Sequence, residues 1–125
     1  MAGDRSVVLV GHCRPDTRRL EAAVTRALPD APVHAVNDDA SLEPHLSRNP
    51  VLLINRVLYG KFANDSGIEL IRRICGGEAP PPCLLISNFE DARAEAVEAG
   101  AKAGFGKRQL HEEETARILR EAATS

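Results

Sequence analysis

The sequence has 125 residues, of which 43% are hydrophobic and 27% are charged, and its formal net charge is −2. This length and balance predict a globular protein with a single domain over residues 1–125. The small negative charge argues against binding to nucleic-acid phosphates or to an anionic membrane, and no apolar run approaches the roughly 20 residues that a membrane helix needs. We therefore expect a cytoplasmic protein with neither nucleic acid nor membrane as a partner.

Short apolar runs of strand length recur along the chain. Unbroken apolar runs are typical of strands that are buried on both faces, and such strands usually belong to parallel sheets. The runs predict strands at residues 6–10, 32–36, 51–54 and 83–86, with a short Gly-rich candidate at 101–106.

A helical pattern follows each of these predicted strands. Ser66 and Glu69 have the spacing of a capping box at the start of the third helix, and Asn88 is expected to cap the fourth. Pro44 lies within the second helix, which must therefore start late or be kinked. Helices are predicted at residues 16–28, 40–47, 66–75, 89–99 and 110–123.

Strand and helix thus alternate five times along the chain. That alternation predicts a parallel sheet with helices on both faces and right-handed crossovers. In a chain of 125 residues it favours the flavodoxin-like, doubly wound (βα)5 fold, with a five-stranded parallel sheet in the strand order 2-1-3-4-5.

The segments around the predicted strand ends form an ordered series. They are residues 8–20 (VLVGHCRPDTRRL), 52–58 (LLINRVL), 66–74 (SGIELIRRI), 83–91 (CLLISNFED) and 96–101 (AVEAGA), followed by Lys107. In order and spacing they resemble the response-regulator receiver (CheY-like) domain of two-component signalling. The likeness includes the first, third and fourth strands of that domain, the helices that follow them, and its lysine. It covers nearly the whole chain.

The resemblance implies a pocket with a defined chemistry at the carboxyl ends of the strands. A receiver uses an Asp that attacks phosphorus, an acidic pair that supplies hard oxygen ligands to Mg²⁺, and a hydroxyl and a Lys that stabilise the transferred group. The corresponding hydroxyl and ammonium here are those of Ser87 and Lys107, but Asn55 occupies the acceptor position. An amide has no anionic oxygen with which to form an acyl phosphate.

The acidic pair of the receiver pocket is also replaced. Depending on the register, it falls on Gly11 and His12 or on His12 and Cys13, and neither choice leaves a carboxylate. Asp16 is the nearest acid, and we expect it to cap the first helix. The pattern predicts a degenerate pseudo-receiver, that is, an atypical receiver that does not accept a phosphoryl group.

We therefore predict a phosphorylation-independent signalling module that acts by protein–protein interaction and uses no cofactor. It is not predicted to be an enzyme, because no set of nucleophile, base and orienting group can be identified. By analogy with the family, the partner is a histidine kinase, an output domain or another receiver. A homodimer would form through the face made by the fourth helix, the fifth strand and the fifth helix.

Two alternatives remain open. His12 and Cys13 could serve a metal- or redox-responsive sensor, because imidazole and thiolate bind soft metals and a nearby cation lowers the pKa of a thiol. Only two such ligands are adjacent, however, and no metal is predicted. The second alternative is a conventional two-component phosphoreceiver whose pocket residues have been matched to the wrong positions of this sequence.

The loop at residues 59–65 is a candidate contact surface. It holds Tyr59 and Phe62, in a chain with one Tyr, three Phe and no Trp. Loops at the carboxyl ends of parallel strands are where α/β proteins bind ligands, and exposed aromatic side chains are common at interfaces. Alternatively, the two rings fold back over the edge of the sheet.

Overall fold

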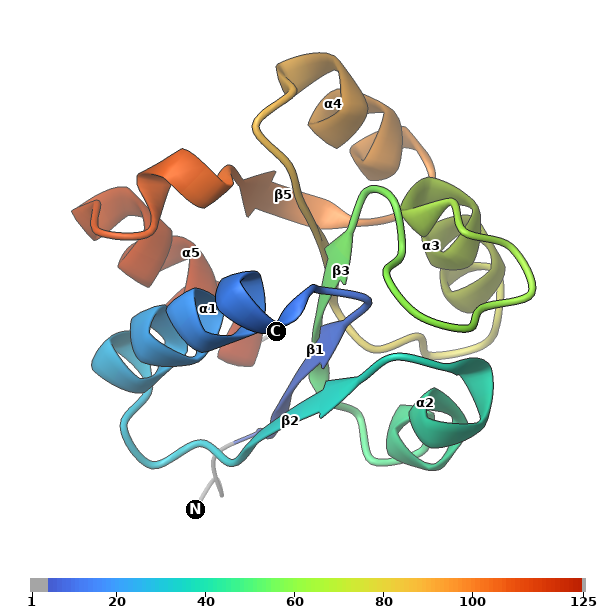
Figure 1. Ribbon diagram of the computed structural model, residues 1–125, viewed down its shortest axis with the longest axis horizontal. Helices are drawn as coiled ribbons and strands as arrows, with labels where there is room; N and C mark the ends of the chain where they lie inside the picture. Colours follow the sequence, from blue (N-terminus) through green and yellow to red (C-terminus); the bar gives the residue numbers. More distant parts are fainter. Residues whose placement is uncertain (1–4, 125) are drawn as a thin grey trace.

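The computed structural model describes residues 5–124, so Met1–Asp4 and Ser125 of the predicted range 1–125 lie outside it. Within these residues, strands and helices alternate along the chain (Figure 1). The strands are β1 (Val7–Val10), β2 (Val33–Val36), β3 (Val51–Asn55), β4 (Cys83–Ile86) and β5 (Lys102–Phe105). The helices are α1 (Arg14–Ala27), α2 (Asp39–Leu46), α3 (Gly67–Cys75), α4 (Glu90–Glu98) and α5 (Glu113–Ala123), and a 3-10 helix, η1 (Lys107–Gln109), precedes α5.

The strands form one sheet in the order β2-β1-β3-β4-β5. Each neighbouring pair is parallel, and Val10 of β1 lies opposite Val36 of β2 and Ile54 of β3. This confirms the flavodoxin-like fold with the predicted strand order. Because the strands are parallel, their carboxyl ends meet at one edge, and the order reverses between β1 and β3. That reversal opens a crevice between the loops that follow these strands.

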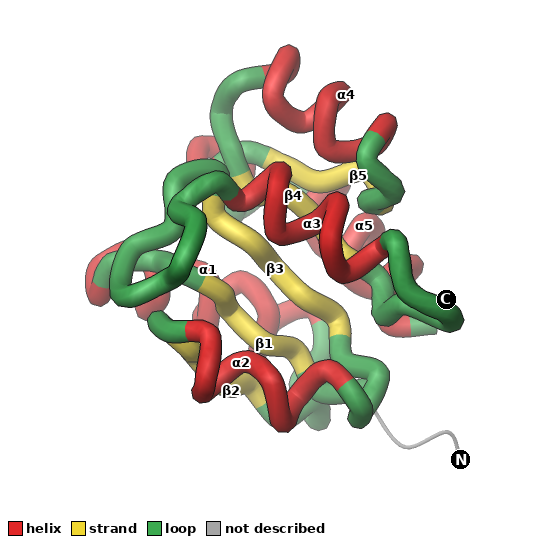
Figure 2. The backbone as a smooth tube through the Cα atoms, turned by 90° about the vertical axis from the view of Figure 1, so that its right-hand side faces the viewer, coloured by secondary structure: helices red, strands yellow, loops and turns green. Residues whose placement is uncertain are grey.

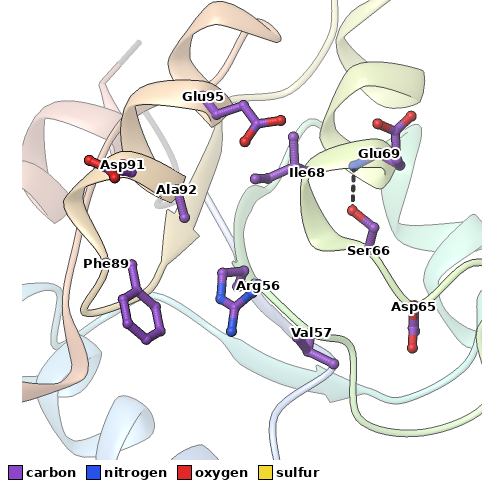
Figure 3. A pocket seen from close by; sticks show the side chains of 10 residues that line it. All are labelled: Arg56, Val57, Asp65, Ser66, Ile68, Glu69, Phe89, Asp91, Ala92 and Glu95. Carbon is purple, nitrogen blue, oxygen red and sulfur yellow. Dashed lines mark hydrogen bonds between the residues drawn. The ribbon is translucent and has the colours of Figure 1, made fainter.

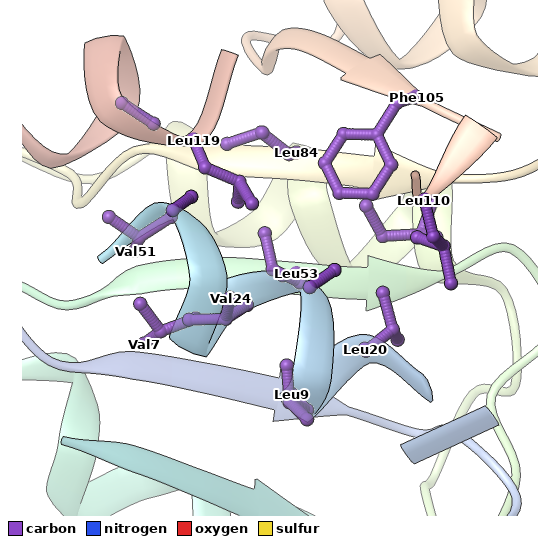
Figure 4. Packing of buried hydrophobic residues seen from close by; sticks show 14 residues of the cluster. Val7, Leu9, Leu20, Val24, Val51, Leu53, Leu84, Phe105, Leu110 and Leu119 are labelled. Atoms are coloured by element: carbon purple, nitrogen blue, oxygen red, sulfur yellow. The ribbon is translucent and has the colours of Figure 1, made fainter. Parts of the chain in front are cut away.

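Helices cover both faces of the sheet. Helices α1 and α5 lie on one face and α2, α3 and α4 on the other (Figures 1 and 2). Successive strand residues point to opposite faces, so Leu9 and Leu53 pack beneath α1 and α5 while Val10 and Ile54 pack on the other side. Figure 4 shows the first of these clusters, in which Phe105 is among the largest buried side chains. This double burial explains why β1, β3 and β4 are apolar without interruption.

Two helix starts differ by two residues or more from the sequence predictions, and one predicted helix cap is wrong. Helix α1 begins two residues early, at Arg14, because Pro15 suits a first turn in which its missing N–H is not needed. Helix α5 begins at Glu113 rather than at residue 110, since η1 takes up the chain before it. The prediction that Asn88 caps α4 is wrong: Phe89 holds the N-cap position. The Asn88 side-chain oxygen instead accepts a hydrogen bond from the backbone N–H of Arg108 (3.0 Å).

Helix α2 contains Pro44 but does not start late as predicted, because it begins at Asp39, one residue before the predicted start. Its N-cap is Asp38, whose carboxylate accepts a hydrogen bond from the backbone N–H of Ser41 (2.7 Å), and Pro44 lies inside it. Proline inside a helix removes one backbone hydrogen bond, so α2 tolerates this loss within its eight residues. No helix formed by residues 5–124 is long and apolar enough to cross a membrane.

Candidate functional site

Asn55 ends β3 at the edge of the sheet where β1 and β4 also end. Its side-chain nitrogen donates hydrogen bonds to the carbonyl oxygens of Gly11 and Val57, each over 2.9 Å. Its side-chain oxygen accepts from the backbone N–H of Arg56 and from the ammonium of Lys107, each over 3.1 Å. The amide therefore uses both of its donor hydrogens and accepts twice. A carboxylate could not donate to the two carbonyls, so this hydrogen-bonding pattern is specific to an amide.

Lys107 follows β5 and reaches a second partner across the crevice. Its Nζ donates to Oδ2 of Asp16 over 2.8 Å, and both side chains are about one-fifth exposed (21%). The hydrogen bond from this ammonium holds the pKa of the Asp16 carboxyl below its usual range. The prediction that Asp16 caps α1 is wrong, because Cys13 holds the N-cap position and Asp16 lies in the first turn. The ammonium is thus already neutralised by a carboxylate.

His12 is buried behind the end of β1. It follows Gly11, whose φ of 73° is a left-handed conformation that favours glycine. The ring Nε2 lies 2.9 Å from the carbonyl oxygen of Leu53. A carbonyl only accepts, so Nε2 carries the proton and Nδ1 is a bare acceptor, buried and without a hydrogen-bond partner among residues 5–124. Burial lowers the pKa of His12 to about 4, which leaves the ring neutral at physiological pH.

Ser87 directly follows β4, whose last residue, Ile86, is paired with Asn55. The side chain is buried, and its hydroxyl oxygen accepts from the backbone N–H of Phe89 (3.1 Å). Cys13 is partly buried, and its side chain makes no capping bond. The hydroxyl, like the amide of Asn55, therefore holds the backbone of a following loop.

No family model and no curated protein sequence matches the chain. Solved structures do match it. The signal receiver domain of a DNA-binding response regulator from Colwellia psychrerythraea 34H superposes with a TM-score of 0.77 at 17% identity, over 98% of this chain and 100% of the other. A response regulator from Thermotoga maritima gives a TM-score of 0.72 at 19% identity, over 98% and 99%. The chain has the fold of a response-regulator receiver domain.

A third receiver structure extends the comparison. The response regulator receiver protein from Pseudoalteromonas atlantica matches with a TM-score of 0.71 at 21% identity, over 94% of this chain and 96% of that one. The receiver fold therefore spans nearly the whole length of this chain, as the sequence resemblance implied.

The residues predicted for the receiver pocket lie at one edge of the sheet. Gly11, Asn55 and Lys107 are joined by hydrogen bonds. His12 and Cys13 follow Gly11 directly, and Ser87 follows the neighbouring strand. Asp16 lies three residues after Cys13, but its ion pair with Lys107 is made only in the folded chain, since the two residues are 91 positions apart.

The structure divides the two aromatic residues of the candidate contact loop. Tyr59 is 56% exposed, and its backbone N–H donates to the carbonyl oxygen of Gly11 (2.8 Å). Phe62 is partly buried and packs against the core on the face covered by α2, α3 and α4. Tyr59 is therefore available for contact with a partner, whereas Phe62 folds back onto the sheet.

The metal-sensor alternative finds little support in the geometry. Residues 5–124 contain no group of three or more His, Cys, Asp and Glu side chains that could hold a metal ion. Cys75 ends α3 and Cys83 begins β4, so both lie toward the end of the sheet away from Cys13. His12 and Cys13 remain a pair of residues, and one ring nitrogen of His12 already bonds to Leu53.

One feature of this edge was not predicted from the sequence. The guanidinium of Arg56 lies over the ring of Phe89, 5.0 Å from its centroid, and Figure 3 shows the two side chains beside one another. Each residue follows the end of a strand closely, Arg56 after β3 and Phe89 after β4. Strand-end positions could have suggested that they are neighbours, but the stacking itself depends on the folded loops.

Proposed function

We propose that this chain is a receiver-like signalling module that works without phosphorylation and acts by protein–protein contact rather than as an enzyme. The observation that carries the proposal is the pair of contacts of Lys107. Its ammonium donates to Asp16 over 2.8 Å and to Asn55 over 3.1 Å. These partners supply, from within the chain, the negative charge and the acceptor that an incoming phosphoryl group would otherwise offer.

The chemistry of the neighbouring positions supports the same proposal. Phosphoryl transfer to a receiver needs a carboxylate nucleophile and a Mg²⁺ ion held by hard oxygen ligands. Asn55 has an amide whose nitrogen is bonded to two carbonyls. Gly11 has no side chain, His12 is neutral and buried, and Cys13 offers a sulfur atom. None of these groups replaces a carboxylate ligand.

The partners proposed for the module are a histidine kinase, an output domain or another receiver. The Colwellia neighbour is the receiver domain of a DNA-binding response regulator, which is a precedent for control of an output domain. The face formed by α4, β5 and α5 is the proposed site of a homodimer. Val97 of α4 is 47% exposed, so this helix has an apolar side chain open to solvent.

The test is incubation of the purified chain with acetyl phosphate and Mg²⁺, followed by intact mass spectrometry. We expect no phosphoryl group on the wild type. We expect none on Asn55→Asp either, because the new carboxylate restores the nucleophile while Gly11, His12 and Cys13 still supply no carboxylate ligand for Mg²⁺. A conventional receiver treated in parallel shows that the donor is active. Phosphorylation of the wild type that is lost when Lys107 is changed to Ala would overturn the proposal and favour the conventional phosphoreceiver.

A further inference from the structure

A groove of about 590 Å³ lies between the starts of α3 and α4, beside the Asn55 pocket (Figure 3). Its apolar part includes two side chains that are largely open to solvent, Phe89 (61% exposed) and Val57 (51% exposed). Ile68 of α3 and Ala92 of α4 continue this apolar lining. An exposed aromatic ring beside other apolar groups is typical of a contact surface, and this chain has only one Tyr and three Phe.

The charges around this groove have mainly one sign. Its acidic lining residues are Asp65 and Glu69 on the α3 side and Asp91 and Glu95 on α4. Its basic lining residue is Arg56, which is held over the ring of Phe89. Glu69 also pairs with a residue of its own helix, so Asp65, Asp91 and Glu95 carry most of the available negative charge. A complementary ligand therefore combines apolar and positively charged groups.

The groove is tied to the pocket by two hydrogen bonds. The side-chain oxygen of Asn55 accepts from the backbone N–H of Arg56 (3.1 Å), and the hydroxyl of Ser87 accepts from the backbone N–H of Phe89 (3.1 Å). The stacked pair of Arg56 and Phe89 is thus positioned by the two polar side chains of the adjacent pocket. A groove that is held in one shape binds with a smaller entropic cost than a mobile one.

We propose that this groove binds a cationic amphipathic segment of a partner protein. Apolar side chains of that segment would pack on Phe89 and Val57, and its Lys or Arg side chains would lie near Asp91, Glu95 and Asp65. The proposal rests on the proposed function, since it gives the interaction module a surface and a class of partner. This surface differs from the α4-β5-α5 face that is proposed for a homodimer.

The test uses the full chain and a synthetic helical peptide of Leu and Lys, with Leu at i, i+3, i+4 and i+7. Nitrogen-15 NMR titration locates the contact, and fluorescence anisotropy measures the affinity. We expect saturable shifts at Phe89, Val57 and Glu95, and no binding of a matched Leu and Glu peptide. Shifts that spread over the whole acidic surface without centring on the groove, or the absence of binding, would contradict the proposal.

Matched variants sharpen this test. Phe89→Ala should weaken binding of the Leu/Lys peptide about tenfold, whereas Val97→Ala, which removes another exposed apolar side chain from α4, should change the affinity less than about twofold. Glu95→Lys should weaken binding and Glu98→Lys, on the same helix but outside the groove, should not. Equal effects of Phe89→Ala and Val97→Ala would overturn the assignment to the groove.

Peptide binding by Ser87 variants tests whether the Ser87 hydroxyl positions Phe89. Ser87→Ala removes the acceptor for the Phe89 N–H and should weaken peptide binding several-fold, while Ser87→Thr keeps the hydroxyl and should restore it. Equal binding by Ser87→Ala and the wild type would remove the link between the pocket and the groove. The peptide titration and the acetyl phosphate assay are independent, so uptake of a phosphoryl group with intact peptide binding would refute the proposed function alone.

Discussion

The amide of Asn55 and the ammonium of Lys107 determine what the edge of the sheet can do chemically. Asn55 joins the ends of β1 and β3 by donating to Gly11 and Val57, which a carboxylate at the same place could not do. Lys107 has a carboxylate partner in Asp16 and an amide partner in Asn55. Every polar group in this set therefore has a partner from within the chain.

His12 leads to a prediction about the pH dependence of stability. Its pKa is about 4 in the folded chain, against 6.5 when the ring is in water, because burial disfavours the charged ring. The unfolded chain therefore takes up a proton first as the pH falls. The contribution of neutral His12 to the free energy of unfolding is fully present above pH 6.5 and is lost progressively as the pH falls toward 4. Between pH 7 and pH 5 this contribution falls by about 2 kcal/mol.

Urea unfolding of the wild type and of His12→Gln at pH 7 and pH 5 measures this effect. The variant should lose about 2 kcal/mol less than the wild type over the same interval. The comparison removes the contribution of His45, whose pKa is also lowered by burial. A ring that titrates near pH 6.5 in an NMR titration of the folded wild type would contradict the buried, neutral assignment.

Some of these residue contacts follow from the sequence and others do not. The resemblance to receiver domains predicted that Asn55, Ser87 and Lys107 share one pocket, and each of them lies at or just after the end of a strand. The pairing of Asp16 with Lys107 could not, since it depends on the direction of a first-turn side chain across the crevice. The oxygen of Asn88 is a second example: its partner, the N–H of Arg108, is a long-range donor, and a local capping pattern had predicted a different role.

The junction between β3 and α3 is the element on which the pocket and the groove both depend. Its loop is closed by the hydrogen bond from Leu58 N–H to Asp65 O (2.8 Å), and the first turn of α3 packs directly on the end of β3. A Cβ on Gly67 would collide with the carbonyl oxygen of Asn55. Helix α3 can therefore approach β3 this closely only with glycine at that position.

Gly67→Ala should thus lower the free energy of unfolding by about 1–3 kcal/mol, because the helix must move away from the strand. Gly77→Ala is the matched control: a Cβ there would meet only the carbonyl oxygen of Ile74, at an ordinary 3.6 Å. Its effect should stay within about 0.5 kcal/mol. Urea unfolding measures both variants, and equal stabilities would contradict the close packing of α3 on β3.

The bounds of a strand could be predicted from the sequence where the strand is buried on both faces, because burial there requires apolar residues at every position. Strands β1, β3 and β4 are buried at nearly every position, so their apolar runs mark them to within one residue. Helix starts were less predictable, because Phe89 before α4 stacks with Arg56, and Lys107 of η1 pairs with Asp16, far away in the sequence. The partly exposed β5 has the weakest apolar pattern, and the register of its pairing with β4 shifts between Leu84 and Ile86.

At the scale of the whole molecule, the strand order brings the pocket and the groove to one end of the sheet. Loops after β1, β3, β4 and β5 meet there, and the side chains of Asn55 and Ser87 join the two sites. The proposed consequence is a receiver fold whose polar pocket maintains a contact surface in one state. Such a module would present this surface to its partner without needing a phosphoryl group.

Nitrogen-15 NMR of the chain with beryllofluoride and Mg²⁺ tests this account most directly, because beryllofluoride imitates a phosphoryl group on a receiver carboxylate. We predict that the amide resonances of Asn55, Ser87 and Lys107 stay unchanged, since the pocket offers no carboxylate nucleophile at Asn55 and its ammonium is already paired. A conventional receiver under the same conditions provides the positive control. Saturable, Mg²⁺-dependent shifts at these three residues would contradict the central claim.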